Sequence, residues 1–151
     1  MPISAPELLN KATAYCAEAE RCAGQTLTKL RQWGATERQV DEVMDYLRRH
    51  RYLDDARYAG AYARDKFRFN GWGKKKIALY LRQAGVPDAC IAEALEALDE
   101  DAYRGRLAAL LAAKRKSLKD TDPAARAKLF RFALSRGFEP DEIARALRDV
   151  L

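Results

Sequence analysis

Three glycines at nearly equal intervals constrain the fold of this chain more than any other feature. Gly34, Gly85 and Gly137 lie 51 and 52 residues apart, and each ends a run with apolar residues at three- and four-residue spacing. A glycine in this place is typical of the left-handed residue that follows an α-helix. Equal periods of this length indicate stacked helical units, so the chain is expected to be an internal repeat.

The residues around each glycine repeat as well. Apolar side chains follow six, ten and thirteen positions later, as Val40, Met44 and Leu47, as Ile91, Leu95 and Leu98, and as Ile143, Leu147 and Val150. A short helix is predicted before each glycine, over 27–33, 77–84 and 129–136. Longer helices are predicted over 5–22, 54–69 and 101–116. Strand-like alternation of β-branched residues is missing.

The pattern therefore predicts an all-α fold of three tandem three-helix repeats. The repeats are expected over residues 1–51, 52–98 and 99–151, and neighbouring repeats are expected to share surface in an elongated, curved helical array. Three helix starts have cap signals. Thr36 with Gln39 is typical of a capping box, Asp54 is expected to cap the middle repeat's first helix, and Asp122 before Pro123 is predicted as an N-cap.

Composition limits the class of protein. The longest uninterrupted apolar stretch is the seven residues Leu107–Ala113, whereas a membrane helix needs roughly 20. No apolar signal segment opens the chain, so a cytoplasmic protein without membrane attachment is expected. Cys16, Cys22 and Cys90 form no CxxC pair, which argues against a disulfide scaffold or a structural zinc site.

Positive charge is concentrated in two blocks. The chain has 28 Lys and Arg against 22 Asp and Glu, a net charge of +6. Residues 48–82 hold 11 of the basic residues against three acidic ones, and residues 114–136 hold eight against two. Clustering of this kind favours a polyanionic partner. The alternative for any single cation is that it only solvates the outer face of a helix.

The cations expected to contact a partner or DNA come from these two blocks. Around two closely spaced glycines, Gly71 and Gly73, lysines and arginines alternate with Phe67, Phe69 and Trp72, a mixture that suits phosphates and bases or a protein groove. The two glycines predict an exposed loop, and Trp72 is expected to pack between helices. The candidate contact residues are Arg48, Arg49, Arg51, Arg57, Arg64, Lys66, Arg68, Lys74, Lys75, Lys76, Lys114, Arg115, Lys116 and Lys119.

No pattern for catalysis or for a cofactor is present. His50 is the single histidine and stands among arginines, so no nucleophile–histidine pair or imidazole metal cluster is expected. Gly73-Lys74 lacks the earlier glycine and the following Ser or Thr of a phosphate loop. The carboxylates at 54–55 and 99–101 could hold Mg²⁺, but helix starts attract acidic residues without an ion. The chain is therefore predicted to have no catalytic residue, metal or cofactor and not to be an enzyme.

One segment resembles a known family. Residues Arg51–Val86 combine a Leu53-Asp54-Asp55 turn, a Gly71-x-Gly73 loop and a Lys-Ile-x3-Leu helix that ends in Gly-Val. This combination is similar to the central motif of the RecX regulatory proteins. The segments Leu30–Gly34 and Lys128–Leu147 resemble the first and third repeats of that family, so the likeness covers nearly the whole chain.

The resemblance implies a small bacterial modulator of the RecA recombinase. A protein of this family is expected to bind in the groove of the RecA–DNA filament as a monomer. It would limit filament growth, ATPase, strand exchange and co-protease activity, and so restrain recombination and the SOS response. Weak, non-specific affinity for single-stranded and double-stranded DNA is expected as well. The alternative is a non-specific DNA-binding or architectural protein that acts independently of RecA.

Overall fold

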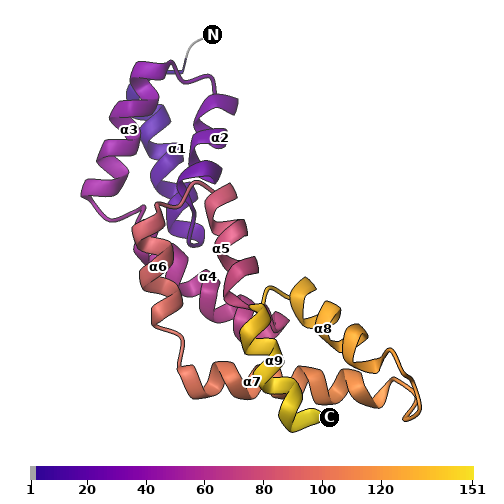
Figure 1. Ribbon diagram of the computed structural model, residues 1–151. Helices are drawn as coiled ribbons and strands as arrows, with labels where there is room; N and C mark the ends of the chain where they lie inside the picture. The colour runs from indigo at the N-terminus through magenta and orange to yellow at the C-terminus, as the bar shows by residue number, and fades with distance from the viewer. Residues whose placement is uncertain (1–2) are drawn as a thin grey trace. The chain divides into compact units, whose positions relative to one another are not determined.

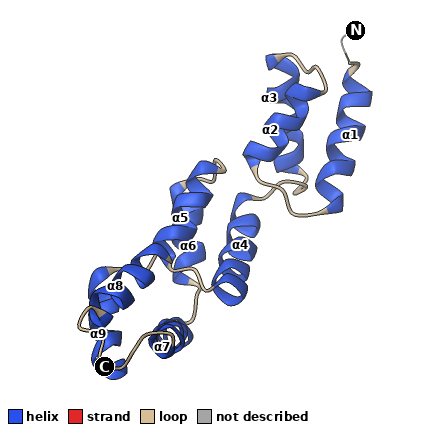
Figure 2. Ribbon diagram, turned by 90° about the vertical axis from the view of Figure 1, so that its right-hand side faces the viewer, coloured by secondary structure: helices blue, strands red, loops and turns tan. Residues whose placement is uncertain are grey.

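The computed structural model describes residues 3–151, and this part of the chain forms nine α-helices and no strand (Figure 2). The helices are α1 (Ala5–Glu18), α2 (Ala23–Gln32), α3 (Glu37–Arg49), α4 (Asp55–Asn70), α5 (Lys74–Gln83), α6 (Asp88–Glu96), α7 (Glu100–Lys116), α8 (Ala125–Ser135) and α9 (Pro140–Val150). The predicted all-α helical repeat is confirmed.

The helices belong to two compact units. The first unit runs to Ala59 and includes Leu81–Ile91, and the second consists of Gly60–Tyr80 and Ala92–Leu151. In the first unit α1, α2 and α3 each contact the other two, and α7, α8 and α9 do the same in the second unit (Figure 1). The repeat boundaries at 51/52 and 98/99 stay a prediction.

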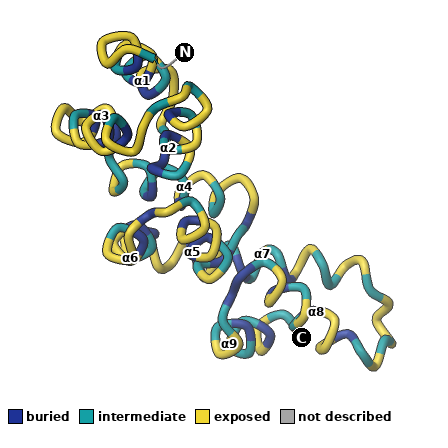
Figure 3. Tube along the Cα trace, turned by 90° about the horizontal axis from the view of Figure 1, so that it is seen from above, coloured by how far each residue is buried: buried dark blue, intermediate teal, exposed yellow. Residues whose placement is uncertain are grey.

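The apolar positions that recur after each glycine form much of the core. All of them are buried except Leu95 and Val150, which are partly exposed. In the first unit the buried stretches of α1, α2 and α3 face one another (Figure 3). Leu8, Leu30 and Leu47 on these helices are fully buried. Burial of these side chains stabilises the fold by roughly 1.5–3 kcal/mol each.

The predicted helix ends are mostly confirmed. Gly34, Gly85 and Gly137 have φ angles of 87°, 85° and 98°, the left-handed conformation expected after a helix. Thr36 and Gln39 form the capping box of α3 through reciprocal hydrogen bonds of 3.2 and 2.9 Å. These ends depend on residues close in sequence, which is why the pattern predicts them.

The prediction that Asp122 caps the last repeat's second helix is wrong. The cap residue of α8 is Ala124, and no side chain caps this helix. Asp122 instead accepts hydrogen bonds from the Ala124 N–H at 2.8 Å and from the Lys128 ammonium at 2.7 Å. These two bonds hold the pKa of Asp122 below its usual range. The aspartate therefore stabilises a turn that precedes the helix.

Cys22 also has a different place from the one expected. The first helix ends at Glu18, four residues before Cys22. The Cys22 thiol accepts the Gln25 N–H at 3.4 Å, and the Gln25 side chain accepts the Cys22 N–H at 3.0 Å. Cys22 thus begins α2 through a capping box in which sulfur replaces the usual hydroxyl.

Each unit contains a main-chain contact between the start of a second helix and a turn before a third helix. In the first unit the Gly24 N–H donates to the carbonyl oxygen of Ala84 at 3.2 Å. In the second unit the Gly73 N–H donates to the carbonyl oxygen of Arg136 at 2.6 Å and the Lys75 N–H to that of Gly137 at 3.0 Å. Hydrogen bonds between main-chain groups therefore join residues far apart in sequence within each unit.

The prediction of an exposed loop at Gly71 and Gly73 is wrong, because both glycines are buried. A Cβ atom at Gly73 would lie 2.5 Å from the carbonyl oxygen of Gly137. The loop passes so close to the turn between α8 and α9 that only a hydrogen atom fits there. The second glycine thus serves close packing rather than exposure.

Tyr103 on α7 also contacts this loop, and removal of its hydroxyl group tests the contact. Its hydroxyl accepts the Lys74 N–H at 2.8 Å, and the residue is only 1% exposed. The variant Tyr103→Phe leaves this N–H without an acceptor, so we expect the free energy of unfolding to fall by about 1 kcal/mol near pH 7. Urea denaturation followed by circular dichroism measures the difference.

The pH dependence of this difference has a definite sign. Burial raises the pKa of Tyr103 well above its ordinary value, so the phenol of the unfolded chain ionises first. Wild-type stability from this group is complete below about pH 10 and declines above it. The deficit of Tyr103→Phe should therefore shrink between about pH 9 and pH 11. A deficit that stays constant over this range would contradict the expected protection of the phenol.

Candidate partner-binding surface

A group of aromatic rings and cations lies on α4, the α4–α5 loop and α5. The Trp72 ring centroid is 4.9 Å from that of Tyr80 and 6.4 Å from that of Tyr62. The ammonium of Lys66 lies 5.0 Å and that of Lys76 4.6 Å from the indole centroid. We call these five residues the Trp72 cluster; all of them belong to the second unit.

Helical spacing brings the members of the Trp72 cluster together. Tyr62 and Lys66 are four residues apart on α4, as are Lys76 and Tyr80 on α5, so each pair shares one helix face. Trp72 is half-buried between them, as predicted, and its main-chain N–H donates to the carbonyl oxygen of Lys66 at 3.1 Å. The sequence argument missed Tyr80, although the four-residue spacing from Lys76 is a signal that could have identified it.

The cluster carries positive charge without a compensating carboxylate. Within residues 3–151, neither Lys66 nor Lys76 forms an ion pair, and the rings hold both ammonium groups in place. Such contacts are worth about 0.5–2 kcal/mol, which restricts the lysines without neutralising them. Exposed apolar groups lie on the same two helices, with Phe69 71% and Tyr80 43% exposed. The surface can therefore bind an anionic partner that also presents apolar area.

The other two lysines at the start of α5 have protein partners. The Lys74 ammonium lies 4.7 Å from the Tyr103 centroid and 3.9 Å from Glu100, and the Lys75 ammonium lies 3.9 Å from Glu139. Lys74 and Lys76 are half-buried against aromatic rings. Only Lys75 is largely exposed among the three.

Most of the predicted arginines of the first unit are paired with carboxylates. The pairs are Arg48 with Asp55 at 4.0 Å, Arg49 with Asp45 at 2.9 Å and Arg57 with Glu20 at 2.5 Å. Arg51 is exposed, and its carbonyl oxygen accepts a hydrogen bond from the Arg57 guanidinium at 3.2 Å. Pairing lowers the local field, so these arginines offer less free charge than their number in the sequence indicates.

The remaining predicted cations lie on the second unit, where all are exposed except the half-buried Lys114 and Arg115. Arg64 and Arg68 are exposed on α4, and the Arg68 guanidinium lies 5.6 Å from the Phe69 centroid. The block at the end of α7 comprises Lys114, Arg115, Lys116 and Lys119. Its first three cations occupy the last helical turn, where the helix dipole favours positive charge.

Arg136 connects the two basic blocks and was not among the predicted contact residues. Its guanidinium donates to the carbonyl oxygen of Asn70 at 3.2 Å and lies 5.2 Å from the Phe132 centroid. The Lys114 ammonium lies 5.4 Å from the centroid of the same ring. A series of contacts thus runs from the end of α4 to the end of α7.

The acidic groups considered for Mg²⁺ act as helix caps. Asp54 accepts the Arg57 N–H at 3.0 Å, and Asp99 accepts the Ala102 N–H at 2.8 Å. Within the described residues, no group of three His, Cys, Asp or Glu side chains is placed to hold a metal ion. None of the described helices is both long enough and apolar enough to span a bilayer.

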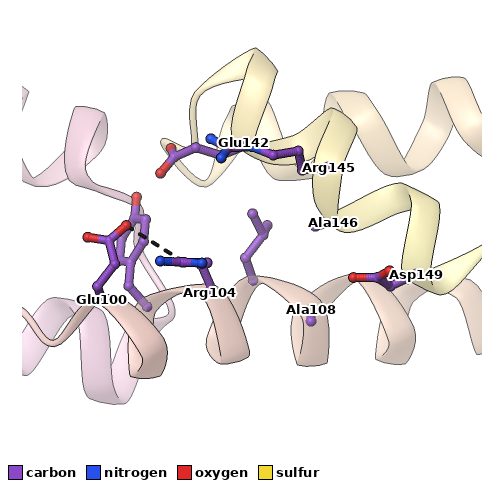
Figure 4. A pocket seen from close by; sticks show the side chains of 9 residues that line it. Glu100, Arg104, Ala108, Glu142, Arg145, Ala146 and Asp149 are labelled. Carbon is purple, nitrogen blue, oxygen red and sulfur yellow. Dashed lines mark ion pairs between the residues drawn. The ribbon is translucent and has the colours of Figure 1, made fainter.

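A pocket of about 300 Å³ lies between α7 and α9. Figure 4 shows Glu100 and Arg104 projecting from α7, and Glu142 and Arg145 from α9. Arg104 is 3.8 Å from Glu100, so these two charges pair with one another. The lining combines both signs of charge, with Glu100, Glu142 and Asp149 beside Arg104 and Arg145.

Comparison with known proteins identifies the protein family of this chain. The models of the second and third three-helix domains of RecX match residues 54–95 and 102–147. The chain is 32% identical over 146 residues to the regulatory protein RecX of Vibrio parahaemolyticus, covering 95% of this chain and 92% of that protein. It is 30% identical over 130 residues to RecX of Clostridium botulinum strain Eklund 17B, with 84% of this chain covered.

The chain spans 60% of the length of that clostridial relative. Among solved structures, the crystal structure of RecX from Lactobacillus salivarius has the same fold, with a TM-score of 0.87 at 24% sequence identity. The alignment covers 97% of this chain and 96% of that one. By its domain matches and its relatives, the chain belongs to the RecX family of regulatory proteins.

Proposed function

We propose that this protein is a negative regulator of RecA that binds in the groove of the RecA–DNA filament. It limits filament growth, ATPase, strand exchange and co-protease activity, and thereby restrains DNA recombination, repair and the SOS response. It acts as a cytoplasmic monomer without a catalytic residue, metal or cofactor. Membership of the RecX family carries the proposal.

The Trp72 cluster supports a binding mechanism for this function. Its two unpaired ammonium groups are held against the indole ring before any partner arrives, so little side-chain entropy is lost on binding. Phosphate oxygens or surface carboxylates of a filament provide the matching negative charge. The exposed rings of Phe69 and Tyr80 add apolar contact area. Binding alone hinders the filament, because no covalent step is needed to block a groove.

The direct test follows ATP hydrolysis by RecA on single-stranded DNA after addition of substoichiometric protein. We expect the rate to fall, because one bound regulator hinders extension of a filament that contains many RecA subunits. The effect should weaken with rising salt, since charged contacts are screened. An unchanged ATPase rate at low salt would overturn the proposal.

The unpaired cations also favour a second candidate, an architectural DNA-binding protein that acts without RecA. Filter binding over a salt series distinguishes the two. Contact with six to ten phosphates would make the affinity fall by roughly 10³–10⁵ between about 50 and 200 mM salt. Tight DNA binding of this kind, combined with no effect on RecA, would support the second candidate. Weak DNA binding with strong RecA inhibition is the expected result.

A further inference from the structure

An open groove in the first unit is lined mostly by residues outside the two basic blocks of the sequence. It has a volume of about 510 Å³, and residues from α1, α2, α4 and α5 line it. All of its lining residues belong to the first unit. The side chains that define its chemistry are Tyr15, Gln25, Thr28, Lys29, Tyr58 and Gln83.

The groove favours an anionic ligand. No carboxylate lines it, and within residues 3–151 Lys29 forms no ion pair; its ammonium lies 5.8 Å from the Tyr15 centroid. Gln25 uses its side-chain oxygen to accept the Cys22 N–H, which leaves the amide nitrogen to donate. Gln83, the last residue of α5, supplies a further side-chain amide to the lining. The lining thus presents one positive charge and two side-chain amides and no negative charge.

The walls are held in place before a ligand binds. The Gly24 N–H donates to the carbonyl oxygen of Ala84, and a Cβ at Gly24 would lie 2.8 Å from that oxygen. The main chain at the start of α2 is therefore in direct contact with the main chain after α5. The Arg21 guanidinium lies 4.0 Å from the Tyr15 centroid and donates to the Tyr15 carbonyl at 3.1 Å. These contacts fix one aromatic wall on α1. A preformed groove binds with a smaller entropic cost than one that must be ordered.

We propose that this groove binds a short stretch of single-stranded nucleic acid. Lys29 and the glutamine amides contact phosphate oxygens, and an unstacked base packs against the tyrosine side of the groove. A base within a duplex is stacked and paired, so its face cannot reach a concave aromatic wall. A peptide of Asp and Glu residues would satisfy Lys29 but has no aromatic ring to pack against the tyrosine side of the groove. The assignment adds a nucleic-acid contact in the first unit and does not depend on RecA.

The test compares two charge reversals by fluorescence anisotropy with a labelled oligothymidylate at low salt. Lys29→Glu is expected to weaken binding about tenfold, because it replaces a cation that contacts phosphate by an anion that repels it. Lys11→Glu is the matched control, because it makes the same charge change on the same unit. The Lys11 ammonium lies 5.7 Å from the Trp33 centroid, and Lys11 does not line the groove. We expect Lys11→Glu to change the affinity by less than about twofold.

A second variant and a duplex probe make the test specific. Gln83→Glu places a carboxylate in the groove at an exposed position, so the fold should be unaffected while oligothymidylate binding weakens. Binding of a duplex should be equal for wild type and Lys29→Glu. Equal losses for the Lys29 and Lys11 variants, an equal loss with duplex, or displacement of the oligonucleotide by polyglutamate would overturn the proposal. RecA ATPase is not measured in this test, so failure of the proposed function is seen separately.

Discussion

Replacing Gly73 by alanine is expected to lower the free energy of unfolding by about 3 kcal/mol, a large effect for a single methyl group. The added Cβ would lie 2.5 Å from the carbonyl oxygen of Gly137 and 2.6 Å from the main-chain nitrogen of Phe138. Main-chain atoms cannot move aside as the end of a flexible side chain can. Relief requires the loop to separate from the turn between α8 and α9, which breaks the short bond from the Gly73 N–H to Arg136.

Two other glycines provide controls that separate packing from backbone conformation. Gly105 lies within α7, and a Cβ added there would meet no neighbouring atom within 4 Å, so Gly105→Ala should raise stability by about 0.5–1 kcal/mol. Gly34 has open surroundings but a φ of 87°, so Gly34→Ala should cost about 1 kcal/mol through conformation alone. Urea denaturation of the three variants gives the comparison. A Gly73→Ala variant as stable as wild type would show that the loop contact is not tight.

Reversing the charge of both Lys66 and Lys76 is expected to raise the concentration needed to inhibit RecA ATPase by at least about tenfold. Each ammonium lies over the Trp72 ring without a carboxylate partner, so both charges are available to a partner. Glutamate at these positions repels a negatively charged filament and removes the attraction between cation and ring. The measurement is ATP hydrolysis on single-stranded DNA at fixed RecA and increasing amounts of variant.

The control is a double reversal with the same change in net charge. Arg38→Glu with Arg145→Glu changes two exposed arginines, each already paired with a carboxylate on its own helix. We expect this control to keep most of the inhibition. The conservative pair Lys66→Arg and Lys76→Arg should keep it as well, because both charges remain above the ring. Equal loss in the two reversal variants would mean that net charge, rather than the Trp72 cluster, sets the affinity.

Local sequence signals predicted much of the fold. The glycines after the second helices have the expected left-handed conformation, and the Thr36 capping box forms between residues three positions apart. Such features are decided by atoms within one helical turn, so a single sequence contains the required information. The recurring apolar positions are informative for the same reason, since helical spacing alone places them on one face.

The features that could not be predicted join residues far apart in the chain. Arg57 is paired with Glu20, 37 positions away, and Arg136 bonds to Asn70, 66 positions away. Charge counting along the sequence treats such groups as free, because it does not reveal which carboxylate packing brings beside a given cation. The contact of Lys74 with Tyr103 follows the same rule: the sequence indicates the basic segment, but the burial of Lys74 depends on α7.

The glycine-lined main-chain contacts also bear on how such a protein can be engineered. At Gly24 and Gly73 the joined groups are N–H and C=O, which every residue except proline offers in the same form. What the contact demands of the sequence is the absence of a side chain, at Gly24 in the first unit and at both Gly73 and Gly137 in the second. Helical segments grafted from a distant homologue should therefore fit at these points if glycine is kept, even when the surrounding residues share little identity.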